Sequence, residues 1–203
     1  ANTITVYSLA ADDGCISMDP AQGGYSFNAQ MINAGDEDHW ISWGFPLAGL
    51  VKFVLPTGIN AADVTSVTLK LYTYGRADDT SLGAKTGDIN YPDGPFCVLQ
   101  HFTSDRAAGL NASDATAATE DIAIDAEVAW RDVYFDVTAA VKADLAAAYV
   151  RSSFRTQAVD YTGRILTVAD KTEFFGYLTS YGTADLPESY SSSWPMLTIE
   201  YVP

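Results

Sequence analysis

Residues 133–149 constrain the fold more than any other stretch, because a short strand leads directly into an amphipathic helix. Val133-Tyr134-Phe135 alternates as a half-buried strand does, and Asp136 or Thr138 can accept hydrogen bonds from the N–H groups of a first helical turn. Apolar residues then recur every fourth position, as on one face of a helix: Val137, Val141, Leu145 and Tyr149. The pattern predicts a short α-helix at about 137–149 in a chain that otherwise reads as strands.

Alternation with a period of two predicts those strands. Val67, Leu69 and Leu71 fall on one face of a strand, and Thr68, Lys70 and Tyr72 fall on the other. Further strands are predicted, in chain order, at 3–7, 15–18, 40–45, 50–55, 96–102, 127–135, 153–157, 174–179 and 196–201. No internal repeat or linker divides the chain, so residues 1–203 predict one all-β domain, a jelly-roll-like antiparallel β-sandwich.

Three motifs, in order, resemble a known family. They are A-x-V-x-S-x-x-L-x-L-Y at 62–72, F-D-V-T-x-x-V at 135–141 and P-x-L-x-I-x-Y at 195–201. Together they resemble the secreted β-sandwich domains named for the DNRLRE motif, a group similar to alginate-binding carbohydrate-binding modules. The resemblance covers most of residues 40–203 and implies the sandwich fold and binding of a polysaccharide. The motifs are structural signatures and imply no catalytic residues.

The charge balance excludes some partners. The 203 residues include 11 Lys and Arg against 26 Asp and Glu, a formal net charge of −15. A chain without a basic patch is a poor partner for nucleic acid or an anionic lipid surface. No apolar run reaches the roughly 20 residues of a membrane-spanning helix. The chain begins Ala1-Asn2-Thr3, as a chain does after signal cleavage, so we expect an extracellular or cell-surface protein.

The sequence contains no recognisable catalytic motif, so we expect no enzyme. His39 and His101 are the two histidines, and no Gly-x-Ser-x-Gly elbow is present. His39 lies in an acidic segment that reads either as a metal loop or as a solvated turn. His101 ends an apolar strand and is expected to be a hydrogen-bonded residue of the sheet.

Carboxylates in turn-rich segments suggest calcium, which prefers six to eight oxygen ligands. The candidate ligands are Asp36, Asp38, Asp78, Asp79, Asp88 and Asp93. None has the spacing of a dedicated calcium loop. The alternative is that these residues only form turns and keep an acidic protein soluble.

Aromatic residues supply candidate ligand contacts, because a flat ring can stack on the face of a sugar. The candidates are Trp40, Trp43, Tyr72 and Tyr74. Trp40 and Trp43 are three apart in a predicted strand and therefore point to opposite faces, so one of them would be exposed unless both faces are covered. The alternative is that such residues fill the core of the sandwich.

Two covalent modifications are expected from single positions. Cys15 and Cys97 are the only cysteines and would form a disulfide in an oxidising compartment, the alternative being two buried thiols. Asn111-Ala112-Ser113 is a glycosylation acceptor in a polar loop.

Two functional hypotheses follow. In the first, the chain is a structural subunit of an extracellular filament, sheath or tube, a homopolymer joined by strand donation and Ca²⁺. Residues 1–9 would be the donor strand, the alternative being that they form the first strand of their own sheet. In the second, the chain is a carbohydrate-binding module that recognises a cell-surface or extracellular polysaccharide.

Overall fold

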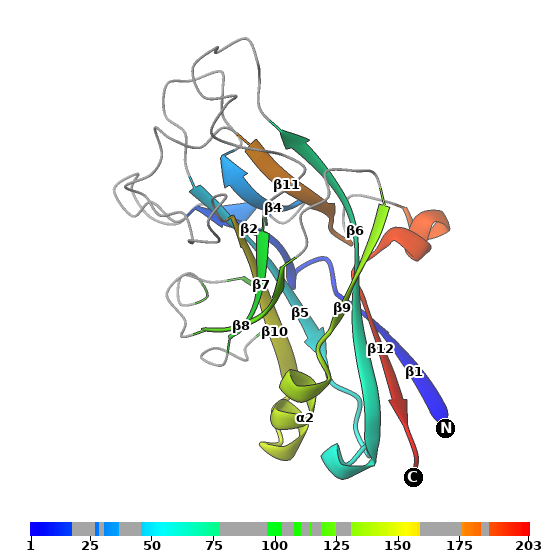
Figure 1. Cartoon of the computed structure of the whole chain (residues 1–203). Coiled ribbons are helices and arrows are strands. Elements are labelled where there is room, and N and C mark those ends of the chain that lie inside the picture. Colours follow the sequence, from blue (N-terminus) through cyan, green and yellow to red (C-terminus); the bar gives the residue numbers. More distant parts are fainter. Residues whose placement is uncertain are drawn as a thin grey trace.

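The structure, a computed structural model, is an antiparallel β-sandwich (Figure 1). It describes residues 1–17, 27–28, 31–36, 46–77, 97–102, 108–110, 114, 119–124, 131–158, 176–183 and 187–203. The predicted fold class, an all-β sandwich with a short helix, is confirmed. The strand predicted at 40–45 lies outside the described residues.

One layer is built on the longest strand, β6. Its members are β1 (Asn2–Tyr7), β12 (Met196–Tyr201), β6 (Val64–Ala77) and β9 (Arg131–Asp136). β12 pairs with β1 on one side and with β6 on the other, and β9 pairs with the far side of β6. β1 is therefore an edge strand, and both chain ends lie at the same end of the sandwich (Figure 1).

The second layer is centred on β5 and β10. Its strands are β2 (Asp13–Ser17), β5 (Pro46–Val54), β10 (Arg151–Ala158), β7 (Cys97–Phe102) and β8 (Thr119–Ile124), paired in that order, with β3 (Phe27–Asn28) on β2. Two further strands, β11 (Gly176–Tyr181) and β4 (Met31–Asp36), join the layers. β11 pairs with β6 on one side and with β4 on the other, and β4 in turn pairs with β5.

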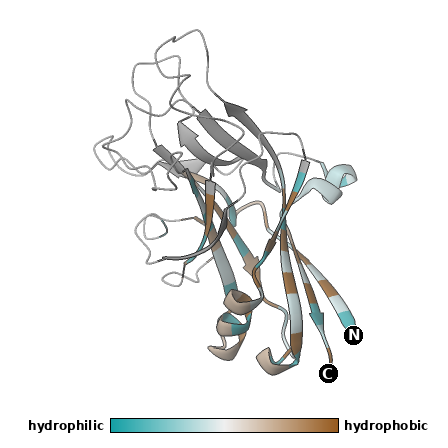
Figure 2. Cartoon of the chain, viewed as in Figure 1, coloured by the Kyte–Doolittle hydropathy of each residue, from teal (hydrophilic) through white to brown (hydrophobic). Residues whose placement is uncertain are grey.

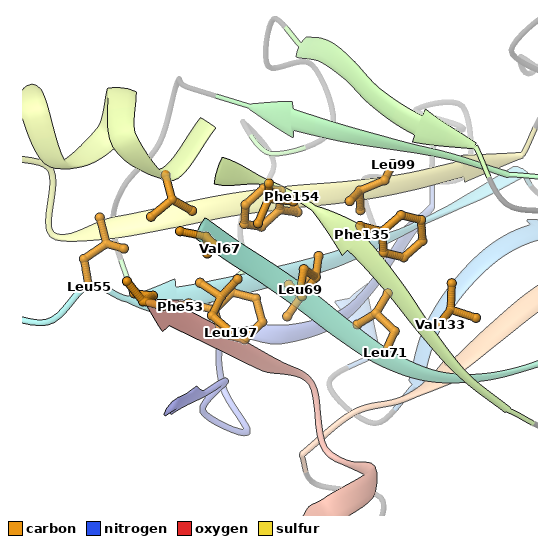
Figure 3. Packing of buried hydrophobic residues seen from close by; sticks show 14 of the residues in the cluster. Phe53, Leu55, Val67, Leu69, Leu71, Leu99, Val133, Phe135, Phe154 and Leu197 are labelled. Atoms are coloured by element: carbon orange, nitrogen blue, oxygen red, sulfur yellow. The ribbon is translucent and has the colours of Figure 1, made fainter. Parts of the chain in front are cut away.

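The hydrophobic core lies between the two layers (Figure 3). From β6 it receives the buried side chains of Val67, Leu69 and Leu71, as the alternation predicted. They face Phe53 and Phe154 of the second layer, whose rings meet edge-on with centroids 6.3 Å apart. Burying a side chain of this size contributes about 1.5–3 kcal/mol, so this row of side chains is a main source of stability.

Helix α2 (Thr138–Ala146) lies at one end of the sandwich and is shorter than the predicted 137–149. Val137 and Val141 are buried and Leu145 packs against the core, as expected. Ala148 adopts a left-handed backbone with φ of 55°, Ala148 N–H donates to the Leu145 carbonyl, and Tyr149 N–H donates to the Asp144 carbonyl. These two bonds form a Schellman ending, so Tyr149 leaves the helical face and is exposed.

Asp136, which precedes the N-cap residue Val137, binds a free N–H at the start of α2. Its Oδ1 accepts hydrogen bonds from Thr138 N at 3.0 Å and from Thr138 Oγ1 at 2.6 Å. Thr138 Oγ1 also accepts a bond of 2.8 Å from Val67 N, so Thr138 joins the helix to β6 rather than capping it. Of the two predicted acceptors, Asp136 is therefore the one that accepts from an N–H of the first turn.

Strand β1 is only partly buried. Ile4 and Val6 are half-buried, whereas the other four residues are exposed. Figure 2 shows the corresponding bands of apolar and polar residues along β1, β12 and β6.

In the part of the chain that the structure describes, no helix has both the length and the apolar character needed to cross a bilayer.

Candidate functional site

The outer face of the β1–β12–β6–β9 layer carries a row of large side chains. Directly opposed residues of antiparallel strands share a face, and the register places Tyr7 opposite Met196, Met196 opposite Lys70, and Lys70 opposite Tyr134. The Trp194 ring packs edge-on against Tyr7, with the ring centroids 6.0 Å apart. We call Tyr7, Trp194, Met196, Lys70 and Tyr134 the outer row.

Polar groups fix one end of the outer row. Lys70 Nζ lies 3.6 Å from Asp132 Oδ1 and donates to the carbonyl of Ser192, in the 3₁₀ segment η5 (Glu188–Ser193). Tyr134 Oη donates to Asp132 Oδ2 at 3.3 Å. Partial desolvation, and then the nearby Asp132 carboxylate, raise the pKa of Tyr134 above its usual 10.0. The Tyr134 hydroxyl therefore stays protonated at neutral pH.

The outer row combines an exposed aromatic ring with a carboxylate, the two kinds of group that commonly contact a sugar. Tyr134 is 61% exposed, so its ring is accessible, and the Asp132 carboxylate beside it can accept hydrogen bonds from hydroxyl groups. Sequence reasoning missed this residue, although the alternation of Val133-Tyr134-Phe135 already placed Tyr134 on the face opposite two core residues.

The predicted ligand residues are partly placed. Tyr72 lies on β6, on the same face as Lys70, is half-buried, and stands opposite Asp132 in the register. Tyr74 stands two residues further along, where its backbone is opposite Thr179 of β11. Trp40 and Trp43 lie outside the described residues. The structure thus brings Tyr72 near the outer row and does not test the two tryptophans.

The predicted calcium ligands also fall largely outside the description. Asp36 is the last residue of β4, and Asp38, Asp78, Asp79, Asp88 and Asp93 lie outside the described residues, as does the glycosylation candidate Asn111. Within the described ranges, no group of three or more His, Cys, Asp or Glu side chains converges on a metal position. Calcium binding stays a prediction, to be checked by comparing thermal unfolding in millimolar Ca²⁺ and in EDTA.

The predicted Cys15–Cys97 disulfide is wrong for this structure. Cys15 on β2 stands opposite Gly49 of β5, which stands opposite Thr156 of β10. Cys97 lies on β7, one strand beyond β10. Three strand spacings separate the two cysteines by roughly 14 Å along the sheet. A disulfide requires Cα atoms within about 7 Å of one another.

A second polar region is buried beneath the β1–β2 connection. Asp12 Oδ1 accepts from Gly109 N at 2.6 Å and Asp12 Oδ2 from Arg151 Nε at 3.2 Å, while Asp13 accepts from the backbone and hydroxyl of Thr183. Burial raises the pKa of Asp13 above its usual 3.8, against the lowering effect of the Thr183 bonds. These carboxylates therefore connect segments of the chain.

His101 of β7, Asp144 of α2 and Ser152 of β10 meet in the interior of the protein. His101 Nε2 lies 2.8 Å from Asp144 Oδ2, and Ser152 Oγ donates to the same oxygen at 2.6 Å. A nucleophilic serine needs its hydroxyl bonded to the histidine. Here both groups meet one carboxylate oxygen, and all three side chains are buried. The expectation that His101 is a hydrogen-bonded residue of the sheet is confirmed.

No protein-family model and no curated protein matches the chain. The resemblance to DNRLRE-type domains stays a prediction.

Proposed function

We propose that this chain is a non-catalytic extracellular structural subunit that assembles with copies of itself into a filament, sheath or tube. The observation that carries the proposal is the position of β1. It lies at the edge of its layer, pairs with β12 alone among the described strands, and exposes four of its six residues.

An edge strand attached in this way can be exchanged between copies at little cost. The ladder that β1 makes with β12 runs from Asn2 opposite Tyr201 to Tyr7 opposite Met196. The β1 strand of a neighbouring copy would form the same ladder and place Ile4 and Val6 over the same apolar positions. Because the bonds lost and gained are identical, the protein concentration and the turn after β1 decide whether the monomer or the exchanged form prevails.

The hinge for this exchange is the turn after β1. Ser8 is buried and lies one residue beyond the end of β1. Its backbone N–H donates to the Pro195 carbonyl, and its hydroxyl donates to the Lys52 carbonyl. Leu9 is exposed, and Asp12 N–H closes the turn onto the Leu9 carbonyl at 2.7 Å. The Ser8 carbonyl also accepts a bond of 3.0 Å from the Thr183 hydroxyl. Exchange therefore requires the turn at 9–12 to open and the three Ser8 bonds to form again in the neighbour. A head-to-tail exchange of this kind propagates as a filament.

Cysteine pairing tests the strand exchange directly. Thr5 and Thr198 stand opposite each other in the β1–β12 ladder, so Thr5→Cys and Thr198→Cys can form a disulfide. The two single variants, each also carrying Cys15→Ala and Cys97→Ala, are mixed and oxidised mildly. If strands are exchanged, the mixture should give a cross-linked heterodimer on a non-reducing gel. The double variant, with Thr5→Cys and Thr198→Cys in one chain, should then give a ladder of covalent multimers.

A matched control uses positions at opposite ends of the same ladder. Asn2→Cys mixed with Met196→Cys should not cross-link, because Asn2 stands opposite Tyr201 and Met196 stands opposite Tyr7. If the double variant yields only cross-linked monomer at concentrations up to millimolar, and electron microscopy shows no polymer, the structural-subunit proposal is wrong.

A second candidate function is polysaccharide binding, favoured by the exposed Tyr134 ring beside Asp132. The test is retention on neutral and weakly acidic polysaccharide gels. Tyr134→Ala should weaken the retention, whereas Tyr149→Ala, which removes an exposed tyrosine just beyond α2, should leave it unchanged. A stacking contact contributes about 0.5–1.5 kcal/mol beyond its buried area, which corresponds to roughly a two- to tenfold loss of affinity. Equal retention of the two variants excludes Tyr134 as the contact.

A further inference from the structure

Lys52 and Asp114 form an ion pair with no access to solvent. Lys52 lies on β5, and Asp114 lies in the connection between β7 and β8. Lys52 Nζ is 2.9 Å from Asp114 Oδ2, and both side chains are 0% exposed. A buried ion pair commonly stabilises a fold less than apolar residues of the same volume would, because desolvation of the charges offsets their attraction. The pair therefore calls for a role beyond stability.

Neighbouring groups hold both partners in place. Lys52 Nζ donates to the Gly109 carbonyl at 2.7 Å, and Gly109 N–H is held by Asp12 Oδ1 at 2.6 Å. Gly109 has a φ of +79°, a conformation that side chains rarely adopt. The Asp114 carbonyl accepts a bond from Arg155 Nη1 at 3.0 Å. The amine and the carboxyl group are thus fixed against each other from separate segments.

The surroundings keep water out and supply a hydroxyl group. The Phe102 ring centroid lies 6.0 Å from Lys52 Nζ. Ser153 of β10 stands directly opposite Lys52, so the two side chains share a face of the sheet. Ser153 Oγ is fully buried and makes no hydrogen bond with any described residue. A buried hydroxyl without a partner is costly.

We propose that Lys52 and Asp114 condense into an intramolecular isopeptide bond. Proton transfer within the pair converts the ammonium and the carboxylate into an amine and a carboxylic acid. Nζ then attacks Cγ of Asp114, so that a C–N bond forms and one C–O bond breaks. The leaving oxygen departs as water with the two protons lost by nitrogen. No oxidant, cofactor or second substrate is consumed.

Proximity and dryness make this condensation feasible without an external catalyst. Well-oriented groups react as if one of them were present at up to about 10⁵–10⁸ M. Neutralising the pair also removes two buried charges, which relieves the desolvation cost. Excluding bulk water slows the reverse hydrolysis. The inference does not rest on the proposed assembly, since a monomer would form the same bond.

Intact-mass spectrometry of the folded, purified chain tests the proposal. The expected mass is lower than the sequence mass by one water molecule. After denaturation, trypsin should fail to cleave at Lys52 and should release residues 1–70 joined to residues 107–131 through Lys52 and Asp114. The full sequence mass, or complete cleavage after Lys52, would overturn the proposal.

Loss of water has a competing source that the peptides distinguish. Asp13-Gly14 and Asp93-Gly94 can form succinimides with the same mass change. Water loss confined to those sites leaves residues 1–52 and 107–131 as separate peptides, and this result would also overturn the proposal.

Variants separate the roles of the participating groups. Lys52→Arg keeps the positive charge and Asp114→Ala removes the electrophile, and both should restore the full mass expected from their sequences. Asp114→Asn should still become joined, by release of ammonia in place of water. Ser153→Ala keeps both reacting groups and should still become joined, with the mass lower by one water molecule than its sequence mass.

Discussion

His101 Nε2 lies 2.8 Å from Asp144 Oδ2, and this contact joins strand β7 to helix α2. Ser152 of β10 donates to the same oxygen at 2.6 Å. One carboxylate of the helix therefore connects it to two neighbouring strands of the second layer. Phe154 lies beside the contact, its ring centroid 5.6 Å from that of His101, so the polar cluster is sealed by the core.

The first prediction concerns this cluster. Asp144→Ala should lower the free energy of unfolding by about 3–5 kcal/mol, because it leaves a buried histidine and a buried serine without their shared acceptor. Urea denaturation followed by tryptophan fluorescence measures the loss. Ala143→Gln, on an exposed position of the same helix, is the matched control and should change stability by less than about 0.5 kcal/mol. A loss of similar size in both variants would refute the explanation.

The second prediction concerns the end of α2. Ala148 has a left-handed backbone, which costs a residue with a Cβ about 1–2 kcal/mol, whereas glycine adopts it freely. Part of that gain is offset by the greater freedom of glycine in the unfolded chain. Ala148→Gly should therefore raise the free energy of unfolding by about 0.5–1 kcal/mol.

The control for Ala148 is two residues away. Ala146 is the last residue of α2 and is also exposed, but it lies within the helix, where glycine is disfavoured. Ala146→Gly should lower the free energy of unfolding by about 0.5–1 kcal/mol. Opposite signs for the two substitutions in thermal denaturation confirm the ending, and the same sign contradicts it.

The fold could be predicted to the extent that side chains alternate. The strands at 64–77 and 196–201 alternate apolar and polar residues, because each has one face against the core. The strand at 151–158 is buried on both faces, and its sequence, RSSFRTQA, does not alternate. β4 (Met31–Asp36) and β8 (Thr119–Ile124) were not predicted. Their sequences, MINAGD and TEDIAI, include Asn, Gly and acidic residues, which are depleted in strands.

The site could be predicted less well, because partners distant in sequence define it. Lys52 lies in a strand that the sequence predicts, but its partners Gly109 and Asp114 are far along the chain, so the pattern around Lys52 does not predict the ion pair. The disulfide failed for the same reason, since cysteine count says nothing about strand order. The sequence likewise does not reveal that Asp12 and Asp13 bind Gly109, Arg151 and Thr183, which lie far along the chain.

The third prediction tests which face of β6 supports the sandwich. Leu69 is fully buried in the core, and Leu69→Ala should lower the free energy of unfolding by about 2–5 kcal/mol. Thr68 is the neighbouring residue on the outer face, and Thr68→Ala should cost under about 1 kcal/mol. Chemical denaturation measures both values. A larger loss for Thr68→Ala would mean that the other face of β6 is packed.

The fourth prediction is a pH dependence at the helix start. Hydrogen bonds from the hydroxyl and the backbone N–H of Thr138 lower the pKa of Asp136 below its usual 3.8. A carboxyl group with a lowered pKa adds stability above its unfolded pKa, and this stability is lost as the pH falls through the folded pKa. Asp136→Ala should therefore cost about 1 kcal/mol near neutral pH, as the loss of a helix cap does, and much less at about pH 2.5.

Asp136→Asn separates the charge from the hydrogen bond in this prediction. An asparagine oxygen still accepts from Thr138 N–H, so the variant should keep most of the neutral-pH stability, since Asn caps helices about as well as Asp. It cannot titrate, so the difference between the wild type and Asp136→Asn should be small at about pH 2.5 and should grow on the rise to neutral pH. Because the Asp136 side chain is exposed, salt should reduce this difference as well. A difference that does not change between acid and neutral pH would mean that the carboxylate charge contributes nothing to the start of α2.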